Sequence, residues 1–282
     1  EEGIDPVTAI RMATLNPSEY FQLHDRGAVA PARRADLVVF SDLRAPRAEM
    51  VFRGGQLVAQ DGQAIPWVRP KPRPVLRSSV NVNWATTHLR IPADGQRVRV
   101  IEVIPEQLVT QARIEALPNH DHTLLTDPAR DILKLAVIER HMATGRVGLG
   151  FVRGLGLRHG AIASSVAHDH HNIVVAGADD LSMLTAVQAV VATQGGMTVA
   201  SGETVVAHLP LPIAGLMSDQ PFETVRQQMD AVRAAARQLG SPLHDPFMTL
   251  SFLALPVIPE LKLTDHGLID VSRNEIVSLF AP

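Results

Sequence analysis

Five consecutive polar residues interrupt an otherwise apolar stretch, SSVAHDHHNIVVAG, and their types could do chemistry: His168, Asp169, His170, His171 and Asn172. Imidazole and carboxylate groups that converge can bind a metal ion, transfer a proton or orient a substrate. A satisfied hydrogen-bond cluster at a domain interface is the structural alternative. In a strand, His168, His170 and Asn172 would share one face, whereas a loop between two strands would let several of these side chains converge.

Other polar residues are weaker candidates. Ser164 and Ser165 precede the cluster and could contact a substrate, although small hydroxyl groups in a buried strand usually bond to the backbone. The sequence NHDH, residues 119–122, also spells His-x-His, but it lies in a loop between elements and we do not expect it to bind metal. The sequence ERH, residues 139–141, could form a charged group, but we interpret it as an exposed strand end. The glycines of RGLGLRHG, residues 153–160, lack the acidic residue of a dinucleotide site and predict a tight chain crossing or a flap.

Composition limits the classes of protein to which the chain can belong. Its 282 residues suggest about two domains. The 26 basic and 29 acidic side chains nearly balance, which argues against a nucleic-acid surface. The absence of cysteine excludes disulfides and thiolate chemistry and fits a reducing compartment. No apolar run has the roughly 18–20 residues of a membrane helix, and no signal peptide opens the chain, so we expect a cytoplasmic protein.

The first third of the chain reads as a helix followed by short strands. Asp5 is a suitable N-cap and Pro6 suits the first helical position, while Asn16-Pro17 is expected to end the helix. Gly54-Gly55 predicts the tip of a β-hairpin. Prolines 66, 70, 72 and 74 favour a stiff, extended connection, where we expect a domain boundary.

From about residue 76 the pattern predicts a layered α+β domain with mostly antiparallel or mixed sheets. Strands are expected on both sides of the histidine cluster, at residues 132–140 and in a hairpin that turns at Ser201-Gly202. One helix should begin at Asp179 or Asp180. A second should be capped by Asp219 and end before Gly240. The apolar segment PFMTLSFLALPVIPEL, residues 246–261, is expected in the core.

One stretch carries a family resemblance. TLNPSEYFQLHDRGAVAPARRADLVVFSDL, residues 14–43, resembles the segment of metal-dependent amidohydrolases in which the last helix of a (β/α)8 barrel leads into a small β-sandwich. The matching positions are Asn16, Pro17, Leu23, Gly27, Pro31, Ala35, Asp36, Leu37 and Val38. Ala32 stands where the family usually has glycine, so we expect either another turn type or local strain there.

Three further motifs resemble the C-terminal domain of bacterial adenine deaminases: residues 154–177, residues 209–219 and residues 246–271. The resemblance implies a barrel helix at 1–23, a β-sandwich portion and linker at 24–75 and a C-terminal α+β domain at 76–282. It also implies hydrolysis of adenine to hypoxanthine and ammonia, as in purine catabolism, with two divalent metal ions, manganese or iron. The opening sequence enters a helix directly, so we expect the C-terminal piece of a longer protein.

The metal ligands of this superfamily all precede the segment matched here, so the resemblance implies that no metal ligand lies in this chain. We therefore expect the isolated chain to be inactive. We expect an accessory catalytic role for His168, Asp169, His171 and Asn172, with His170 as a variable neighbour. The implied partners are adenine, the N-terminal barrel and a second copy, as in a dimer, and neither nucleic acid nor membrane. The alternatives are a non-catalytic assembly domain and part of another cyclic-amide hydrolase.

Overall fold

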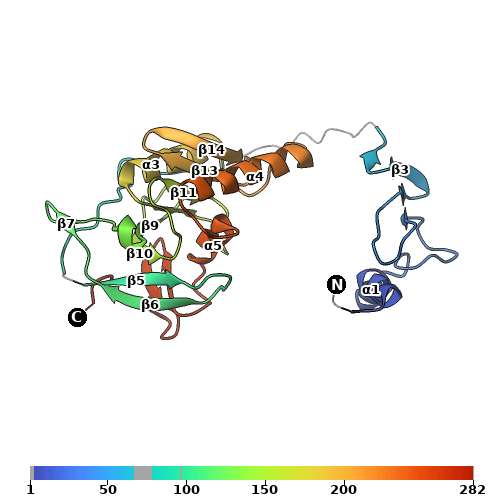
Figure 1. Ribbon diagram of the computed structural model, residues 1–282, viewed down its shortest axis with the longest axis horizontal. Helices are drawn as coiled ribbons and strands as arrows, with labels where there is room; N and C mark the ends of the chain where they lie inside the picture. Colours follow the sequence, from blue (N-terminus) through green and yellow to red (C-terminus); the bar gives the residue numbers. More distant parts are fainter. Residues whose placement is uncertain (1–2, 67–77, 96, 282) are drawn as a thin grey trace. The chain divides into compact units, whose positions relative to one another are not determined.

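The computed structural model describes residues 3–66, 78–95 and 97–281 (Figure 1). The chain divides into two compact units, Glu1–Pro74 and Val75–Pro282. The stiff connection predicted at residues 66–74 lies, from residue 67 onward, outside the described residues.

The first unit begins with two short helices, α1 (Pro6–Ala13) and α2 (Leu15–Tyr20). Asp5 is the N-cap of α1, as predicted, and its carboxylate accepts a hydrogen bond from the Thr8 N–H at 3.0 Å. The expectation that Asn16-Pro17 ends the helix is wrong, because α1 ends at Ala13 and Pro17 lies inside α2. Proline is tolerated there because the first turn of a helix has no intrahelical partner for an N–H.

The rest of this unit is an antiparallel sheet in the order β1-β2-β3-β4, formed by Leu37–Val39, Met50–Arg53, Gln56–Gln60 and Gln63–Ala64. The predicted hairpin is confirmed, since Gly54 and Gly55 both have positive φ between β2 and β3. Asp36 accepts a hydrogen bond from the Gly54 N–H at 2.7 Å and so fixes the tip. Ala32 has a φ of +65° and so adopts the left-handed conformation that is usual for glycine. This conformation is less favourable for alanine, because its Cβ atom crowds the backbone there.

The second unit contains a mixed eight-stranded sheet, which confirms the predicted α+β class. Its order is β14-β13-β11-β12-β9-β10-β5-β6 (Figure 1). The strands are β5 (Val98–Val103), β6 (Thr110–Glu115), β9 (Ile132–Ile138), β10 (Val147–Arg153), β11 (Ala161–Ser164), β12 (Ile173–Gly177), β13 (Gly196–Ser201) and β14 (Thr204–Pro210). All neighbouring strands are antiparallel except β5 and β10, which run parallel.

Helices cover both faces of this sheet. On central strand β9, Leu133, Leu135 and Val137 pack in one cluster with α4 (Phe222–Gln238) and α5 (Pro246–Phe252). Ala136 and Ile138 point the other way and pack with α3 (Asp180–Ala192). Because both faces are covered, β9 is buried along its whole length, which explains its nearly continuous apolar sequence.

Two expectations for the helices need correction. Asp219 does not cap α4: the N-cap is Pro221, without a side-chain cap bond, and the Asp219 carboxylate accepts from the Gln220 side chain instead. The apolar segment at 246–261 begins with a helix that was not predicted, α5, capped by Asp245 through the Met248 N–H at 3.0 Å. Its seven residues are too few to show a clear helical period.

The glycines at 153–160 form a tight crossing, one of the two predicted alternatives. The N–H groups of Gly154 and Gly156 both donate to the Asp131 carboxylate, at 2.9 and 2.8 Å, and both glycines have positive φ. Asp131 follows the 3-10 helix η1 (Pro128–Arg130) and is itself left-handed. A carboxylate at the end of one turn thus holds a second turn in place.

Two small sheets complete the unit. The order β15-β16-β17 is formed by Leu261–Thr264, Gly267–Asp270 and Glu275–Ile276, and β7 (Asn119–His120) pairs with β8 (Thr123–Leu124). The turn after β15 lies against β10: a Cβ atom on Gly148 would meet the Thr264 carbonyl oxygen at 1.8 Å. Across the described part of the chain, every helix falls short of the length and apolar character that a membrane crossing requires.

Candidate functional site

The polar cluster lies in a loop between β11 and β12, which is the loop arrangement considered above. Residues 168–170 form a turn, and His171 has a φ of +51°. The His171 N–H donates to the Ala167 carbonyl at 2.8 Å and closes the turn. The strand register that would place His168, His170 and Asn172 on one face is therefore absent from this loop.

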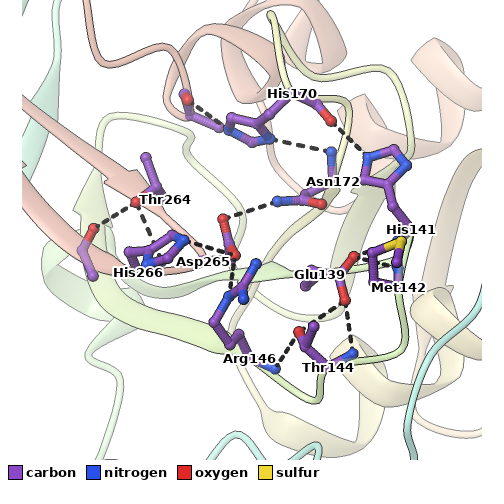
Figure 2. Close-up of polar contacts among 12 residues, drawn as sticks. Glu139, His141, Met142, Thr144, Arg146, His170, Asn172, Thr264, Asp265 and His266 are labelled. Atoms are coloured by element: carbon purple, nitrogen blue, oxygen red, sulfur yellow. Dashed lines mark hydrogen bonds and ion pairs between the residues drawn. The ribbon is translucent and has the colours of Figure 1, made fainter.

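His170 is the histidine of this loop with the most hydrogen bonds. Its Nδ1 accepts from the Asn172 N–H at 3.2 Å, and its Nε2 lies 2.8 Å from the Ala254 carbonyl oxygen. A carbonyl only accepts, so Nε2 is the donor in this contact. Its own carbonyl oxygen accepts from His141 Nε2 at 2.7 Å (Figure 2). The residue expected to be a variable neighbour thus holds the shape of the loop.

Asn172 joins the loop to the turn after β15. Its Nδ2 donates to Asp265 Oδ1 at 3.0 Å, and Asp265 Oδ2 accepts from Arg146 Nε at 2.8 Å and lies 3.6 Å from His266 Nε2 (Figure 2). Asn172 is 3% exposed and the Asp265 side chain 8%. Asn172 Oδ1 is buried without a hydrogen-bond partner among the described residues. The amide is therefore held at its donor end and free at its acceptor end.

Arg140 holds three segments together at the other end of the loop. Its guanidinium donates to the carbonyl oxygens of His171 at 2.5 Å, Ser79 at 2.5 Å and Ala214 at 3.0 Å. The residue is 1% exposed, so the expectation of an exposed strand end is wrong for it. A guanidinium remains charged when buried and its planar donors can reach several carbonyls at once, which suits this position.

Glu139 is also buried, at 3% exposure, and organises the turn that follows β9. Burial disfavours its charge, but backbone N–H groups of Thr144, Met142 and His141 and the Thr144 hydroxyl donate to the carboxylate (Figure 2). These bonds outweigh burial and lower the pKa of Glu139 to about 2. The anionic carboxylate therefore fixes the segment that carries His141.

The other predicted residues of the loop differ in their surroundings. The His168 ring lies against Phe252 with centroids 4.6 Å apart and 6.2 Å from the His171 ring, whereas Asp169 is exposed. Burial, followed by the positive charge of Arg140, lowers the pKa of His171 below 6.5, so its ring is neutral at neutral pH. His171 Nδ1 is buried and has no partner within the described residues.

Both serines bond to the backbone. Ser165 Oγ accepts from the Gly196 N–H at 2.8 Å and donates to the Gly215 carbonyl at 2.6 Å. Ser164 Oγ accepts from the Val166 N–H at 3.0 Å and lies 3.2 Å from the Val166 carbonyl. Both residues are fully buried. Ser165 thus ties the start of the loop to the segment that also bonds Arg140.

The His-x-His pair that was not expected to bind metal, His120 and His122, lies at a two-residue hairpin turn between β7 and β8, where Asp121 and His122 are both left-handed. Within residues 3–66, 78–95 and 97–281, no three His, Cys, Asp or Glu side chains are grouped closely enough to hold a metal ion. Asp265, Arg140 and Glu139 are the site residues that the pattern did not identify as such. For Asp265, the available signal in the sequence was the polar stretch TDHG, residues 264–267.

A cavity of about 250 Å3 lies next to the loop at residues 165–172, called the polar loop below. Phe252 lines this cavity and packs against the His168 ring. It lies between the β5–β6 connection and α5. Lys262 forms part of its wall and is fully buried, and burial lowers the pKa of its ammonium to about 8. Lys262 Nζ donates to the Leu108 carbonyl at 2.9 Å, so the lysine secures the β5–β6 connection.

Two known families match the sequence of this chain. Residues 1–58 match the family described as Amidohydrolase family, and residues 107–275 match the family described as Adenine deaminase C-terminal domain. The second match spans β6 to β16 and includes the polar loop. The class is therefore that of an amidohydrolase segment followed by an α+β domain.

More specifically, the chain belongs to the adenine deaminase family, which confirms the resemblance noted in the sequence. It is 52% identical over 280 residues to the adenine deaminase of Desulfatibacillum aliphaticivorans and 50% identical over 284 residues to that of Methanothrix thermoacetophila. Adenine deaminase 2 of Carboxydothermus hydrogenoformans is 46% identical over 277 residues. These matches cover 98–99% of this chain and 49% of each relative, so the chain spans about half the length of the curated relatives it matches.

Proposed function

We propose that this chain is the C-terminal half of a cytoplasmic adenine deaminase that hydrolyses adenine to hypoxanthine and ammonia, and that the 165–172 loop adds accessory residues to its active site. The supporting observation is that the three deaminase-like motifs meet at this loop. Ser165 and Arg140 connect it to Gly215 and Ala214 in the second motif. His170 and Asn172 connect it to Ala254 and Asp265 in the third.

The proposed roles follow from the chemistry of each side chain. His171, neutral at neutral pH, and His168 could each take up or give a proton, and Asn172 offers a buried carbonyl oxygen as an acceptor. Asp169 is exposed and free to meet a group outside this unit. Ser164 and Ser165 stay weaker candidates for substrate contact, since their hydroxyls already bond to the backbone.

The resemblance to amidohydrolases implies two divalent metal ions, manganese or iron, which would activate the attacking water. The described residues of this chain do not fit such a centre, because they include no cluster of three ligating side chains. We therefore assign the metal ligands to the N-terminal half. In this proposal residues 1–23 complete a (β/α)8 barrel, residues 24–75 form part of a β-sandwich, and residues 76–282 form the C-terminal domain.

The test is adenine turnover in the full-length deaminase, followed as ammonia release. We expect H168N and H171N to lower kcat at least tenfold while the oligomeric state, measured by light scattering, is unchanged. H159N is the matched control, because His159 is exposed on the glycine crossing and lies outside the polar loop. The 282-residue chain alone should release no ammonia from adenine.

Three results would contradict the proposal. Adenine turnover by the purified 282-residue chain would place the catalytic centre within it. Normal kinetics in H168N and H171N, with altered assembly, would instead make the unit a dimerisation domain. Turnover of hydantoin-type substrates but not of adenine would assign the chain to a cyclic-amide hydrolase.

A further inference from the structure

We propose that Asp265 is a positioning residue of this enzyme, which acts through Asn172 by holding the side-chain oxygen of that asparagine ready to accept a hydrogen bond from an N–H group of the aminopurine substrate. The inference rests on the proposed function. It assigns a role to a residue outside the polar loop, on the turn between β15 and β16.

The first step is the orientation of the Asn172 amide. The Asp265 carboxylate only accepts hydrogen bonds, so the amide must turn its Nδ2 toward Asp265 Oδ1, at 3.0 Å. The reverse orientation would bring two oxygen atoms together and lose a charge-assisted bond. Figure 2 shows the Asn172 oxygen pointing away from Asp265. Asp265 therefore selects one of two orientations that have nearly the same shape.

The second step is the rigidity of Asp265. Arg146 Nε donates to its Oδ2 at 2.8 Å, and its side chain is 8% exposed. The turn is braced by Thr264, whose Oγ1 accepts from the His266 N–H and donates to the Gly267 carbonyl, both at 3.3 Å. Gly148 lets this turn lie against β10. The carboxylate therefore stands on a fixed base, which a positioning residue requires.

The third step is the acceptor itself. Asn172 Oδ1 is buried and has no hydrogen-bond partner in the described part of the chain. The same holds for Nδ1 of the preceding residue, His171. A buried polar atom without a partner is unfavourable and calls for an explanation, of which a functional role is one. An amide oxygen accepts from N–H groups, which an aminopurine carries on its ring and on its exocyclic amine. The acceptor thus suits the substrate class that the family implies.

The experiment compares D265N, N172A and the double variant in the full-length deaminase. In D265N the new amide can donate to Asn172 Oδ1, so Asn172 can turn over and lose its free acceptor. We expect kcat/KM for adenine to fall at least tenfold in D265N and in N172A, with little further fall in the double variant. D270N is the control on the same hairpin: Asp270 pairs with exposed Arg273, and its loss should change kcat/KM less than twofold.

A readout independent of activity is the side-chain amide of Asn172 in the 15N–1H spectrum of the full-length protein. Its exchange with solvent should be slow and should accelerate in D265N but not in D270N. Rescue supplies a further arm. N172D/D265N reverses the wild-type bond, with the donor at 265 and the acceptor at 172. It leaves the second oxygen of the new carboxylate at position 172 free to accept and should recover part of the lost kcat/KM.

The outcomes separate this inference from the proposed function. If N172A lowers kcat/KM and D265N leaves it unchanged, the positioning role is wrong although the deaminase assignment stands. Additive losses in the double variant, or an unchanged Asn172 exchange rate in D265N, would also overturn the inference. Absence of adenine turnover in the unmodified full-length protein would overturn the proposed function, and with it the substrate assigned to the Asn172 oxygen.

Discussion

The Arg140 guanidinium donates to the carbonyl oxygen of His171 at 2.5 Å, and this contact joins the end of β9 to the polar loop. The same guanidinium reaches Ser79 and Ala214, so one buried cation satisfies carbonyl groups from three distant segments. Glu139, which precedes Arg140 in the chain, is anionic, and its carboxylate accepts hydrogen bonds from the turn that follows β9. Arg140 thus fixes the polar loop, and Glu139 fixes the turn at residues 141–144.

Removal of the Arg140 charge should destabilise the fold. R140M leaves three carbonyl oxygens without their donor in a buried site, and each such loss costs about 1–3 kcal/mol. We expect the free energy of unfolding, measured with urea, to fall by at least about 3 kcal/mol. R237M is the control, because Arg237 is exposed on α4, and it should change stability by less than about 0.5 kcal/mol. Equal losses in the two variants would refute the role of Arg140.

Glu139 should make stability depend on acid pH. Its pKa is about 2 in the folded chain against an ordinary value of 4.5, so the folded state keeps the anion where the unfolded chain takes up a proton. Its stabilisation, about 3 kcal/mol, is present above pH 4.5 and is lost as the pH falls toward 2. The stability gap between the wild type and E139Q should therefore narrow from pH 6 to pH 2.5. E203Q, at an exposed position, should show no such narrowing.

Local signals in the sequence predicted the elements, because their partners lie nearby in the chain. Asp5 caps α1 through a residue three positions away, and Gly54-Gly55 turn a hairpin whose strands adjoin them. The tertiary contacts of the site lack such signals. Asn172 and Asp265 are 93 positions apart, and no period or cap motif reports their pairing.

Burial also explains why the prediction from the sequence failed for some charged residues. Glu139 and Arg140 were expected at an exposed strand end because charged residues are rarely buried without partners. Here the guanidinium donates to three backbone carbonyls, and the carboxylate accepts from three backbone N–H groups and the Thr144 hydroxyl, which composition does not reveal. Asp219 failed as a predicted cap for a related reason: a capping residue type was present, but α4 begins three positions later, after Pro221.

Gly148 should be indispensable for the position of the β15–β16 turn. In G148A the new Cβ would meet the Thr264 carbonyl oxygen at 1.8 Å, and backbone must move to relieve the clash. We expect a loss of more than about 2 kcal/mol in the free energy of unfolding. G150A is a matched control two residues along the same face of β10, since its Cβ would make ordinary contact with Leu263 at 3.5 Å. A G150A variant as unstable as G148A would show that the strand itself, and not the turn, needs glycine.

His171 should make stability sensitive to pH near neutrality, with a sign that its surroundings determine. Burial, the Arg140 charge and the neighbouring His168 and His170 lower its pKa below 6.5, with Asp169 opposing them. The folded chain therefore resists protonation where the unfolded chain accepts it, so the stabilisation present above pH 6.5 is lost as the pH falls. H171Q, which does not titrate, should lose less stability than the wild type between pH 7.5 and pH 5.5 in urea unfolding, and H159Q should behave like the wild type. A His171 ring resonance that titrates above pH 6.5 would contradict this account, because it would mean that the loop stabilises the imidazolium and that Arg140 does not act on it as a neighbouring cation.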